Sequence, residues 1–345
     1  MKVKFPVEDC LLRERLNAFY GITAESISFI PMGDSAYSYR IHCKNGCQYY
    51  LKLFDHGNER QQQGIARLDR CLPLTWELYN IGLFPTVAYP VKNVQGRFQT
   101  AFDGFTVVIF NYIEGETLAE SYPFSDVILE QVASAMAAIH RLTPLIGTRM
   151  LLTEAYDISF ESRLTSYIGE LEAAATFDSR IKQTLKQEIL SRNDEIMRYL
   201  NLLRKLRRDV LSNPKENVLC HGDLWGGNLI RSSGGELYII DWESAMLAPP
   251  EYDLFNYIGE GFDVFLSAYG RFRETSAPLC PDLLRFFSYR HHLRNLTHWI
   301  ATILHHNTEE AQNENDLDMI LNHCMNRWGR IESDVESVIN MQGRR

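Results

Sequence analysis

Residues 217–242 read NVLCHGDLWGGNLIRSSGGELYIIDW, and three polar side chains in this stretch decide the interpretation of the chain. The apolar residues before His221 predict a strand, the polar residues after it a loop, and the apolar run before Asp241 a second strand. Asp223 and Asn228 lie five residues apart in the loop, and Asp241 follows thirteen residues later. Phosphoryl transfer uses such a trio, because one carboxylate orients the attacking hydroxyl while an amide and a second carboxylate bind Mg²⁺.

The spacing of these residues is that of the catalytic loop and metal-binding aspartate of protein kinases. The form H-G-D-x-x-x-x-N at 221–228, followed by I-D-W at 240–242, resembles the aminoglycoside phosphotransferase and choline kinase branch of the kinase-like fold. Within that branch, the residues at 240–261 and 289–291 are most similar to the spectinomycin phosphotransferase family. The resemblance implies an ATP-dependent phosphotransferase in which Asp223 is the catalytic residue.

The same resemblance assigns the metal ligands, since it implies that Asn228 and Asp241 hold Mg²⁺ on the nucleotide phosphates. His221 is either a base or a buried, hydrogen-bonded histidine, and its match to the histidine of the kinase H-R-D motif favours the structural role. Glu243 either reaches a second metal ion through water or forms a surface salt bridge, which is the favoured interpretation. A plain hairpin turn would leave the flanking strands and glycines of the loop unexplained.

The resemblance implies an α+β, bilobal, protein-kinase-like fold with a small antiparallel-sheet N-lobe and a larger helical C-lobe. We therefore expect an N-lobe over 1–110, a hinge over 111–116 and a C-lobe over 117–345. Hydrophobic periodicity agrees, because most of the strand patterns precede the hinge and the pattern becomes mainly helical from residue 125. The expected strands span 26–32, 37–43, 47–54, 86–94 and 105–112, and the expected helices span 8–20, 60–79, 159–210, 262–275, 282–306 and 316–338, with a further helix from 125.

Lys52 is the candidate ligand of the nucleotide phosphates. It lies in the expected strand 47–54, and its place resembles that of the family's strand lysine, which holds the α- and β-phosphates. Such a lysine usually pairs with a helical carboxylate. Asp69 is seventeen residues on, close to the kinase interval, while Glu59 and Glu77 are rivals for the same role.

A loop upstream of Lys52 is expected to cover the phosphates. By its position in the family, it contains Gly33, Asp34 and Ser35, whose region offers backbone N–H groups to phosphate oxygens. The loop has one glycine, so the glycine-rich signature of protein kinases is absent, and an ordinary hairpin turn is the alternative.

The segment 107–115 resembles the hinge between the lobes. By family register, adenine would bond to the Asn111 carbonyl and the Ile113 amide, and Phe110 would wall the adenine pocket. Backbone contacts leave little trace in a sequence, so these three assignments rest on position. Plain core packing is equally compatible with Phe110.

Composition limits the partners. Lys and Arg total 35 and Asp and Glu total 44, a net charge of −9 in 345 residues, which argues against nucleic acid as the partner. The seven scattered cysteines are typical of reduced thiols. Because no apolar run approaches the roughly 18 residues of a membrane span and no signal segment opens the chain, we expect a cytoplasmic protein without a membrane partner.

Three functions remain open at this point. The first is phosphorylation of an aminocyclitol or aminoglycoside antibiotic, and the acidic balance is compatible with a cationic substrate. The second is a metabolic kinase of an amino alcohol or sugar. The third, a nucleotide-binding regulator or a protein kinase, is disfavoured by the intact set of polar residues and by the absence of an activation segment between Asp241 and Pro249.

Overall fold

The computed structural model describes residues 4–31, 33, 36–147, 151–213, 215–274 and 277–343. The chain forms two packed units, each built from two stretches of sequence. Unit 1 comprises Met1–Leu152 and Leu219–Leu247, and unit 2 comprises Thr153–Val218 and Ala248–Arg345. Unit 1 therefore contains both the expected nucleotide sheet and the stretch 219–247 that carries the polar trio. The expected hinge at 111–116, with an N-lobe before it and a C-lobe after it, stays a prediction.

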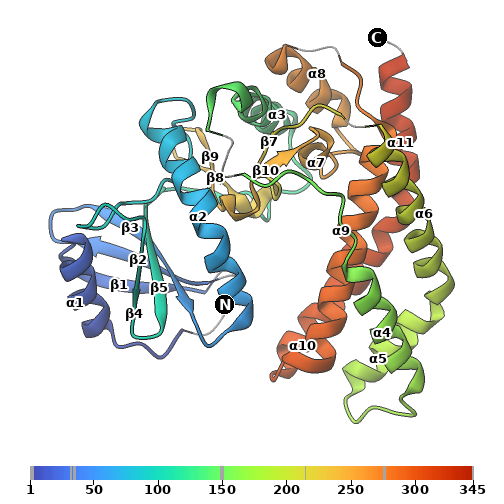
Figure 1. Cartoon of the computed structure of the whole chain (residues 1–345), viewed down its shortest axis with the longest axis horizontal. Coiled ribbons are helices and arrows are strands. Elements are labelled where there is room, and N and C mark those ends of the chain that lie inside the picture. The colour runs from blue at the N-terminus through green and yellow to red at the C-terminus, as the bar shows by residue number, and fades with distance from the viewer. Residues whose placement is uncertain are drawn as a thin grey trace. The chain divides into compact units, whose positions relative to one another are not determined.

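A five-stranded antiparallel sheet forms the N-terminal part of unit 1 (Figure 1). The turn at Asn45 and Gly46 joins two of its strands, as predicted. Gly46 adopts a φ of 81°, a conformation that glycine adopts more readily than other residues do. Along the sheet, the strand order is β1 (Ala24–Ile30), β2 (Tyr37–Cys43), β3 (Gln48–Asp55), β5 (Phe105–Asn111) and β4 (Gln99–Phe102).

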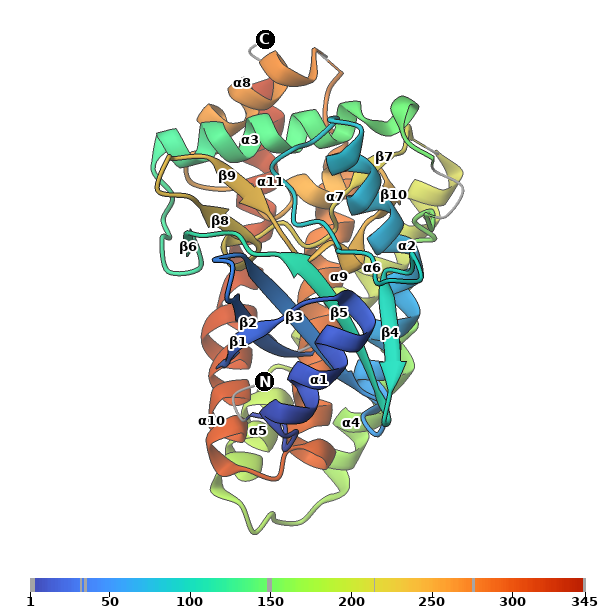
Figure 2. The same cartoon turned by 90° about the vertical axis from the view of Figure 1, so that its left-hand side faces the viewer.

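Two helices, α1 (Asp9–Tyr20) and α2 (Glu59–Asn80), pack on this sheet. Figure 2 shows α1 lying across it, and the buried side chains of α1 share one apolar core with Leu51 and Leu53 of β3. Because successive strand residues point to opposite faces, Lys52 faces the other side, where α2 packs on β3. Helix α2 continues through Pro73, which was expected to disturb it.

One expected strand of unit 1 is wrong. Residues 86–94 form isolated bridges at Val87 and Pro90 instead of a continuous strand. Pro90 has no N–H to donate to a ladder, which explains why its pairing with Phe110 does not extend. The sheet is completed instead by β4, which the sequence pattern did not predict.

The rest of unit 1 supports the polar loop. A three-stranded sheet in the order β6-β8-β9 holds the two strands that follow the loop, and helix α3 follows the hinge region. The remaining elements are β6 (Glu116–Thr117), α3 (Asp126–Arg141), β7 (Val218–Cys220), β8 (Leu229–Arg231), β9 (Leu237–Ile239) and β10 (Met246–Ala248), with β10 paired to β7.

Unit 2 is helical and is organised around α9 (Pro281–Ala301), against which α4, α6 and α11 pack. The expected helix 159–210 is three helices, and 316–338 is also interrupted. The other helices are α4 (Phe160–Ala173), α5 (Arg180–Ser191), α6 (Asn193–Ser212), α7 (Glu251–Leu254), α8 (Phe262–Arg273), α10 (Glu310–Asp318) and α11 (Trp328–Gly343). Among the described residues, no helix has the length and apolar character needed to cross a membrane.

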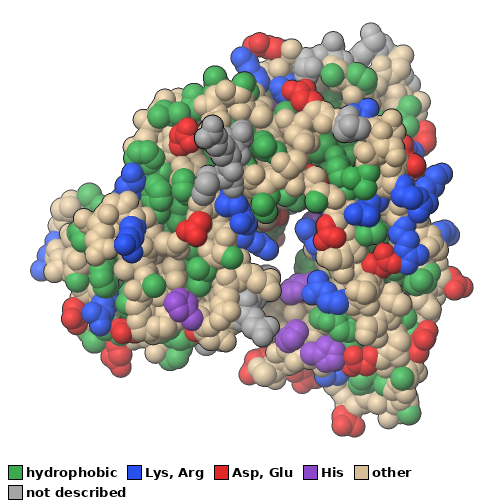
Figure 3. Space-filling view, viewed as in Figure 1, with side chains coloured by type: hydrophobic (Ala, Val, Ile, Leu, Met, Phe, Trp, Pro, Cys, Tyr) green, Lys and Arg blue, Asp and Glu red, His purple; other side chains and the backbone are tan. Residues whose placement is uncertain are grey.

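Polar side chains of unit 2 gather near α10. Figure 3 shows histidine side chains over α9 and α10, and His305 and His306 are exposed there. Asp316, which belongs to the acidic stretch 309–318, is instead buried and accepts hydrogen bonds from Thr302 (2.7 Å) and Asn307 (2.9 Å). This carboxylate therefore fixes the turn between α9 and α10.

Candidate active site

The loop after β7 holds Asp223 and Asn228 against each other. The Asn228 Nδ2 group donates to the Asp223 carboxylate (3.0 Å) and to its backbone carbonyl (2.8 Å). Asn228 is buried, with 6% of its surface exposed. Because the amide nitrogen is committed to Asp223, the side chain presents its Oδ1 as the atom with which to bind a cation.

Two glycines allow the loop to pass close to its neighbours. A Cβ atom at Gly226 would lie 2.4 Å from the Leu118 carbonyl oxygen, and one at Gly227 would lie 2.2 Å from the ring of Trp225. A larger residue at Gly226 would collide with backbone, and one at Gly227 would displace the Trp225 ring. The Trp225 ring therefore lies over Gly227, and 45% of the surface of Trp225 is exposed.

His221 is a structural residue in this geometry. It is fully buried, its Nε2 lies 2.9 Å from the Ile240 carbonyl, and its Nδ1 accepts the Asp223 N–H at 3.3 Å. Both ring nitrogens are thus engaged by backbone groups, which fixes one neutral tautomer. His221 ties the start of the loop to the end of the following strand.

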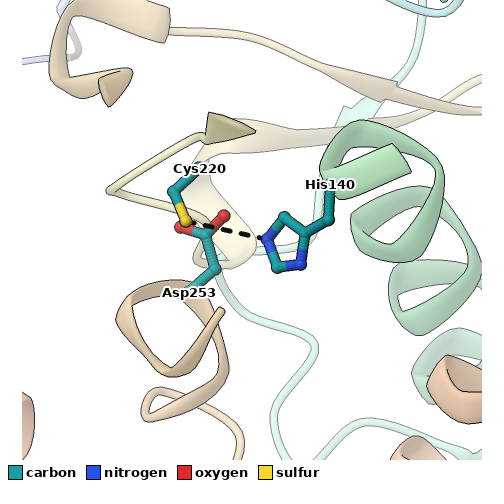
Figure 4. A group of neighbouring side chains, drawn as sticks. All are labelled: His140, Cys220 and Asp253. Carbon is teal, nitrogen blue, oxygen red and sulfur yellow. Dashed lines mark hydrogen bonds between the residues drawn. The ribbon is translucent and has the colours of Figure 1, made fainter. Parts of the chain in front are cut away.

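His140 contacts the strand that precedes the loop. Its Nε2 is 3.9 Å from the Sγ atom of Cys220, the last residue of β7, and both side chains are buried (Figure 4). The contact packs α3 against the strand that leads into the loop. This agrees with a packing role for the histidine near the end of α3.

Asp241 follows β9 in an unusual backbone conformation, with φ 67° and ψ 57°. Left-handed conformations are rare for residues other than glycine and are retained where the surrounding structure requires them. The preceding Ile240 N–H donates to the Asn228 carbonyl at 3.0 Å. The two expected metal ligands are therefore linked through adjacent backbone groups, and the chain turns sharply at Asp241.

Lys52 extends from β3 to this turn. Its ammonium forms ion pairs with the Asp241 carboxylate and with Glu243, the latter at 2.5 Å. The Lys52 Nζ also lies 6.0 Å from the centre of the Phe110 ring. Glu243, expected at the surface, is in fact mostly buried, with 12% of its side chain exposed against 35% for Asp241.

Lys52, Asp241 and Glu243 shift one another's pKa values. Enclosure by protein would raise the pKa of Asp241, but the Lys52 ammonium outweighs it and holds that pKa well below its usual range. Burial and the negative charge of Asp241 raise the pKa of Glu243, whereas the contact with the Lys52 ammonium lowers it. Burial opposes the charge on Lys52, yet the two carboxylates raise its pKa well above the usual value.

The assignment of Asp69 as the partner of Lys52 is wrong. Asp69 is exposed and accepts a hydrogen bond from the Gln99 side chain at 2.7 Å. The register of α2 explains this, because Leu68 and Leu72 occupy its buried face and turn Asp69 outward. Of the rivals, Glu77 lies toward Gly147, and the side chain of Glu59 is outside the described part of the structure.

The hinge residues lie at the end of β5. Phe110 pairs with Tyr50 across the sheet, which places both on the face that carries Lys52. The Asn111 side chain accepts the Tyr89 N–H at 2.8 Å and so anchors the hinge. Within the described residues, the Ile113 amide makes no hydrogen bond to the protein.

The phosphate-covering loop is described only at Gly33, which adopts a φ of 80° and has open space around its Cα. The predictions for Asp34 and Ser35 fall outside the described residues. The open space at Gly33 is compatible with a backbone that approaches a ligand closely.

Residues 26–287 match the model of a phosphotransferase enzyme family. The chain belongs to this family. Because the match covers most of the chain, including the loop and Lys52, the protein is a phosphotransferase whose acceptor is an alcohol group, and the expected kinase-like α+β fold is confirmed.

Individual relatives are more distant. Protein StrN of Streptomyces griseus is 25% identical over 295 residues, which cover 84% of this chain and 83% of StrN. A solved structure of spectinomycin phosphotransferase with ADP and spectinomycin has a TM-score of 0.77 at 17% identity, over 97% of this chain and 99% of that one. A microcompartment-associated aminopropanol kinase has a TM-score of 0.65 at 16% identity, over 95% and 99%. These structures support the fold.

Two residues of the site were missed or misjudged from the sequence. Trp225 follows the catalytic-loop aspartate by two positions, and the pair of glycines after it was the signal that a ring packs there. Glu243 was assigned to the surface. The sequence carried no signal for its burial, because the chain leaves the strand at Asp241 and enters a tight turn over Trp242–Ser244 that has no two-residue alternation.

Proposed function

We propose that this protein transfers the γ-phosphate of ATP to a hydroxyl group of a small molecule, with Asp223 as the catalytic residue. The observation that carries the proposal is the pair of contacts made by Asn228 and Lys52. Asn228 donates a hydrogen bond to the Asp223 carboxylate at 3.0 Å, and Lys52 pairs with Asp241, which follows strand β9. Phosphoryl transfer needs a group that accepts the proton of the attacking hydroxyl, a pair of metal ligands and a cation that binds phosphate.

The donor set fits Mg²⁺. Asn228 Oδ1 and the Asp241 carboxylate are hard oxygen ligands, and the lowered pKa of Asp241 keeps that carboxylate ionised. Bound there, Mg²⁺ would neutralise charge on the phosphates. Asp223 orients the acceptor hydroxyl and takes its proton, while Lys52 binds phosphate oxygens. Phe110, the Asn111 carbonyl and the Ile113 amide would receive the adenine, and the loop of Gly33, Asp34 and Ser35 would cover the phosphates.

For the acceptor, we propose a small amine-bearing polyol, with spectinomycin as the first compound to test. The sequence likeness at 240–261 and 289–291 and the net charge of −9 support this choice. The second candidate is a metabolic amino alcohol or sugar, which is supported by the TM-scores of the aminopropanol kinase and of a choline kinase from Streptococcus pneumoniae (0.55).

A coupled ADP-release screen over aminocyclitols, aminoglycosides, amino alcohols and neutral sugars tests both candidates. A product heavier by one phosphoryl group, identified by mass spectrometry, would support the proposal. Robust turnover of a neutral sugar alone would reject the cationic acceptor and leave the kinase activity intact. Absence of ADP release with every acceptor, together with no binding of Mg·ATP, would reject the proposed function itself.

A further inference from the structure

The partner of Lys52 comes from an unexpected part of the chain. The side chains of α2 that face the Lys52 side of the sheet are uncharged, and within the described part of α2 no carboxylate reaches it. Leu68, Cys71 and Leu72 are buried there, each 5% exposed or less. The negative charges beside Cys71 are instead those of Glu243 and Asp241. Helix α2 packs on the turn η4 (Trp242–Ser244), so the carboxylate comes to the helix from that turn.

The two carboxylates at Lys52 are not equivalent. Asp241 keeps 35% of its side chain exposed, which leaves it open to a ligand, whereas Glu243 keeps 12%. Under the proposed function, Asp241 is drawn to the metal ion, and its share in the Lys52 ion pair weakens. Glu243 then remains as the carboxylate that holds the ammonium.

The backbone explains how both side chains reach one lysine. The left-handed conformation of Asp241 starts a tight turn in which residues 241 and 243 point to one side. Trp242 points to the other side, where it is 3% exposed, donates its Nε1–H to the Ile239 carbonyl at 3.2 Å and packs edge-on against Phe84. The buried indole therefore fixes the orientation of Glu243.

We propose that Glu243 is the positioning residue of Lys52, and that it directs the ammonium at the nucleotide phosphates in place of a carboxylate on α2. The proposal rests on the proposed function, since it assumes that Lys52 binds phosphate. It does not assign Glu243 any contact with the acceptor or with the transferred group.

The test is a set of binding measurements by calorimetry with Mg²⁺ and a non-hydrolysable ATP analogue, compared with adenosine. Glu243→Gln keeps the shape and removes the charge. We expect the affinity for the triphosphate to fall by roughly tenfold or more, because a buried charged partner is lost, while the affinity for adenosine changes less than about twofold. A general loss of packing would weaken both ligands alike.

A double-mutant cycle separates positioning from an independent effect. If Glu243 acts through Lys52, then Glu243→Gln should add little to the loss caused by Lys52→Ala. Fully additive losses would overturn the proposal, as would an unchanged triphosphate affinity in Glu243→Gln. Asp69→Asn is the matched control on α2, and it should leave the affinity at the wild-type value.

A second variant keeps the proposal testable if Glu243→Gln is poorly folded. Glu243→Asp retains the carboxylate on a shorter side chain. Compared with Glu243→Gln, it should bind the triphosphate more tightly and have a lower KM for ATP, while kcat changes by a smaller factor than KM. A Glu243→Asp protein no better than Glu243→Gln would overturn the proposal. If the wild-type protein bound neither ligand, the proposed function would fail first, which distinguishes the two failures.

Discussion

Unit 1 and unit 2 place their buried charges in different ways. In unit 1, Lys52 is held by two carboxylates of one turn, and one of them stays partly open to solvent. In unit 2, Arg290 forms a closed pair with Glu154, at 2.8 and 2.6 Å, both residues are buried, and the Arg290 guanidinium also contacts the rings of Tyr252 and Phe286. An open cluster can exchange a partner for a ligand, whereas a closed pair exposes no charged group to a ligand, and its loss leaves a charge buried without a partner. We infer that buried charge supports chemistry in the first unit and architecture in the second.

The largest effect should come from the loop of unit 1. Asp223→Asn should lower kcat by about 10²–10⁴-fold, because the hydroxyl loses its proton acceptor, while ATP binding and the melting temperature change little. Steady-state kinetics on the best acceptor and a thermal melt measure the two quantities. Retention of more than a third of the wild-type kcat would contradict the assignment.

The reverse pattern is expected for the closed pair of unit 2. Glu154→Ala leaves the Arg290 guanidinium buried without its carboxylate, which should lower the free energy of unfolding by about 3–5 kcal/mol. Denaturant titration measures the loss. The control is Asp282→Ala, because the Asp282 carboxylate is half exposed and pairs with Arg285 at the longer distance of 3.4 Å. A stable Glu154→Ala protein with altered acceptor kinetics would show that this pair also serves chemistry.

The same contrast explains what could be predicted from the sequence. The polar trio lies within one short stretch, and its spacing is set by a tight loop, so the sequence alone could predict that Asp223, Asn228 and the turn at Asp241 lie close together. The pairing of Arg290 with Glu154 spans 136 residues and leaves no local pattern. The Asp69 error has the same origin, because the register of α2 against the sheet depends on packing that the interval from Lys52 does not encode.

The metal ligands offer a finer test within unit 1. Asp241→Ala should weaken Mg²⁺-dependent ATP binding more than Asn228→Ala does, because a carboxylate is the stronger ligand for a hard cation. Calorimetric titration of Mg·ATP into each variant, repeated without Mg²⁺, gives the comparison. Equal affinities in both variants and the wild-type protein would remove the metal from this site.

The smallest expected effect concerns Trp225, whose partly exposed ring lies over Gly227 in the loop of Asp223. We expect Trp225→Ala to raise KM for a cationic or ring-shaped acceptor by roughly fivefold, since an aromatic face contributes about 1 kcal/mol to binding an ammonium group. KM for ATP should stay near the wild-type value, because none of the nucleotide contacts proposed above is made by the Trp225 ring. Trp225→Phe keeps a ring over Gly227 and should recover most of the affinity. If both variants raised KM for ATP and acceptor equally, then Trp225 would be a packing residue of the loop, and the acceptor would have to be recognised elsewhere.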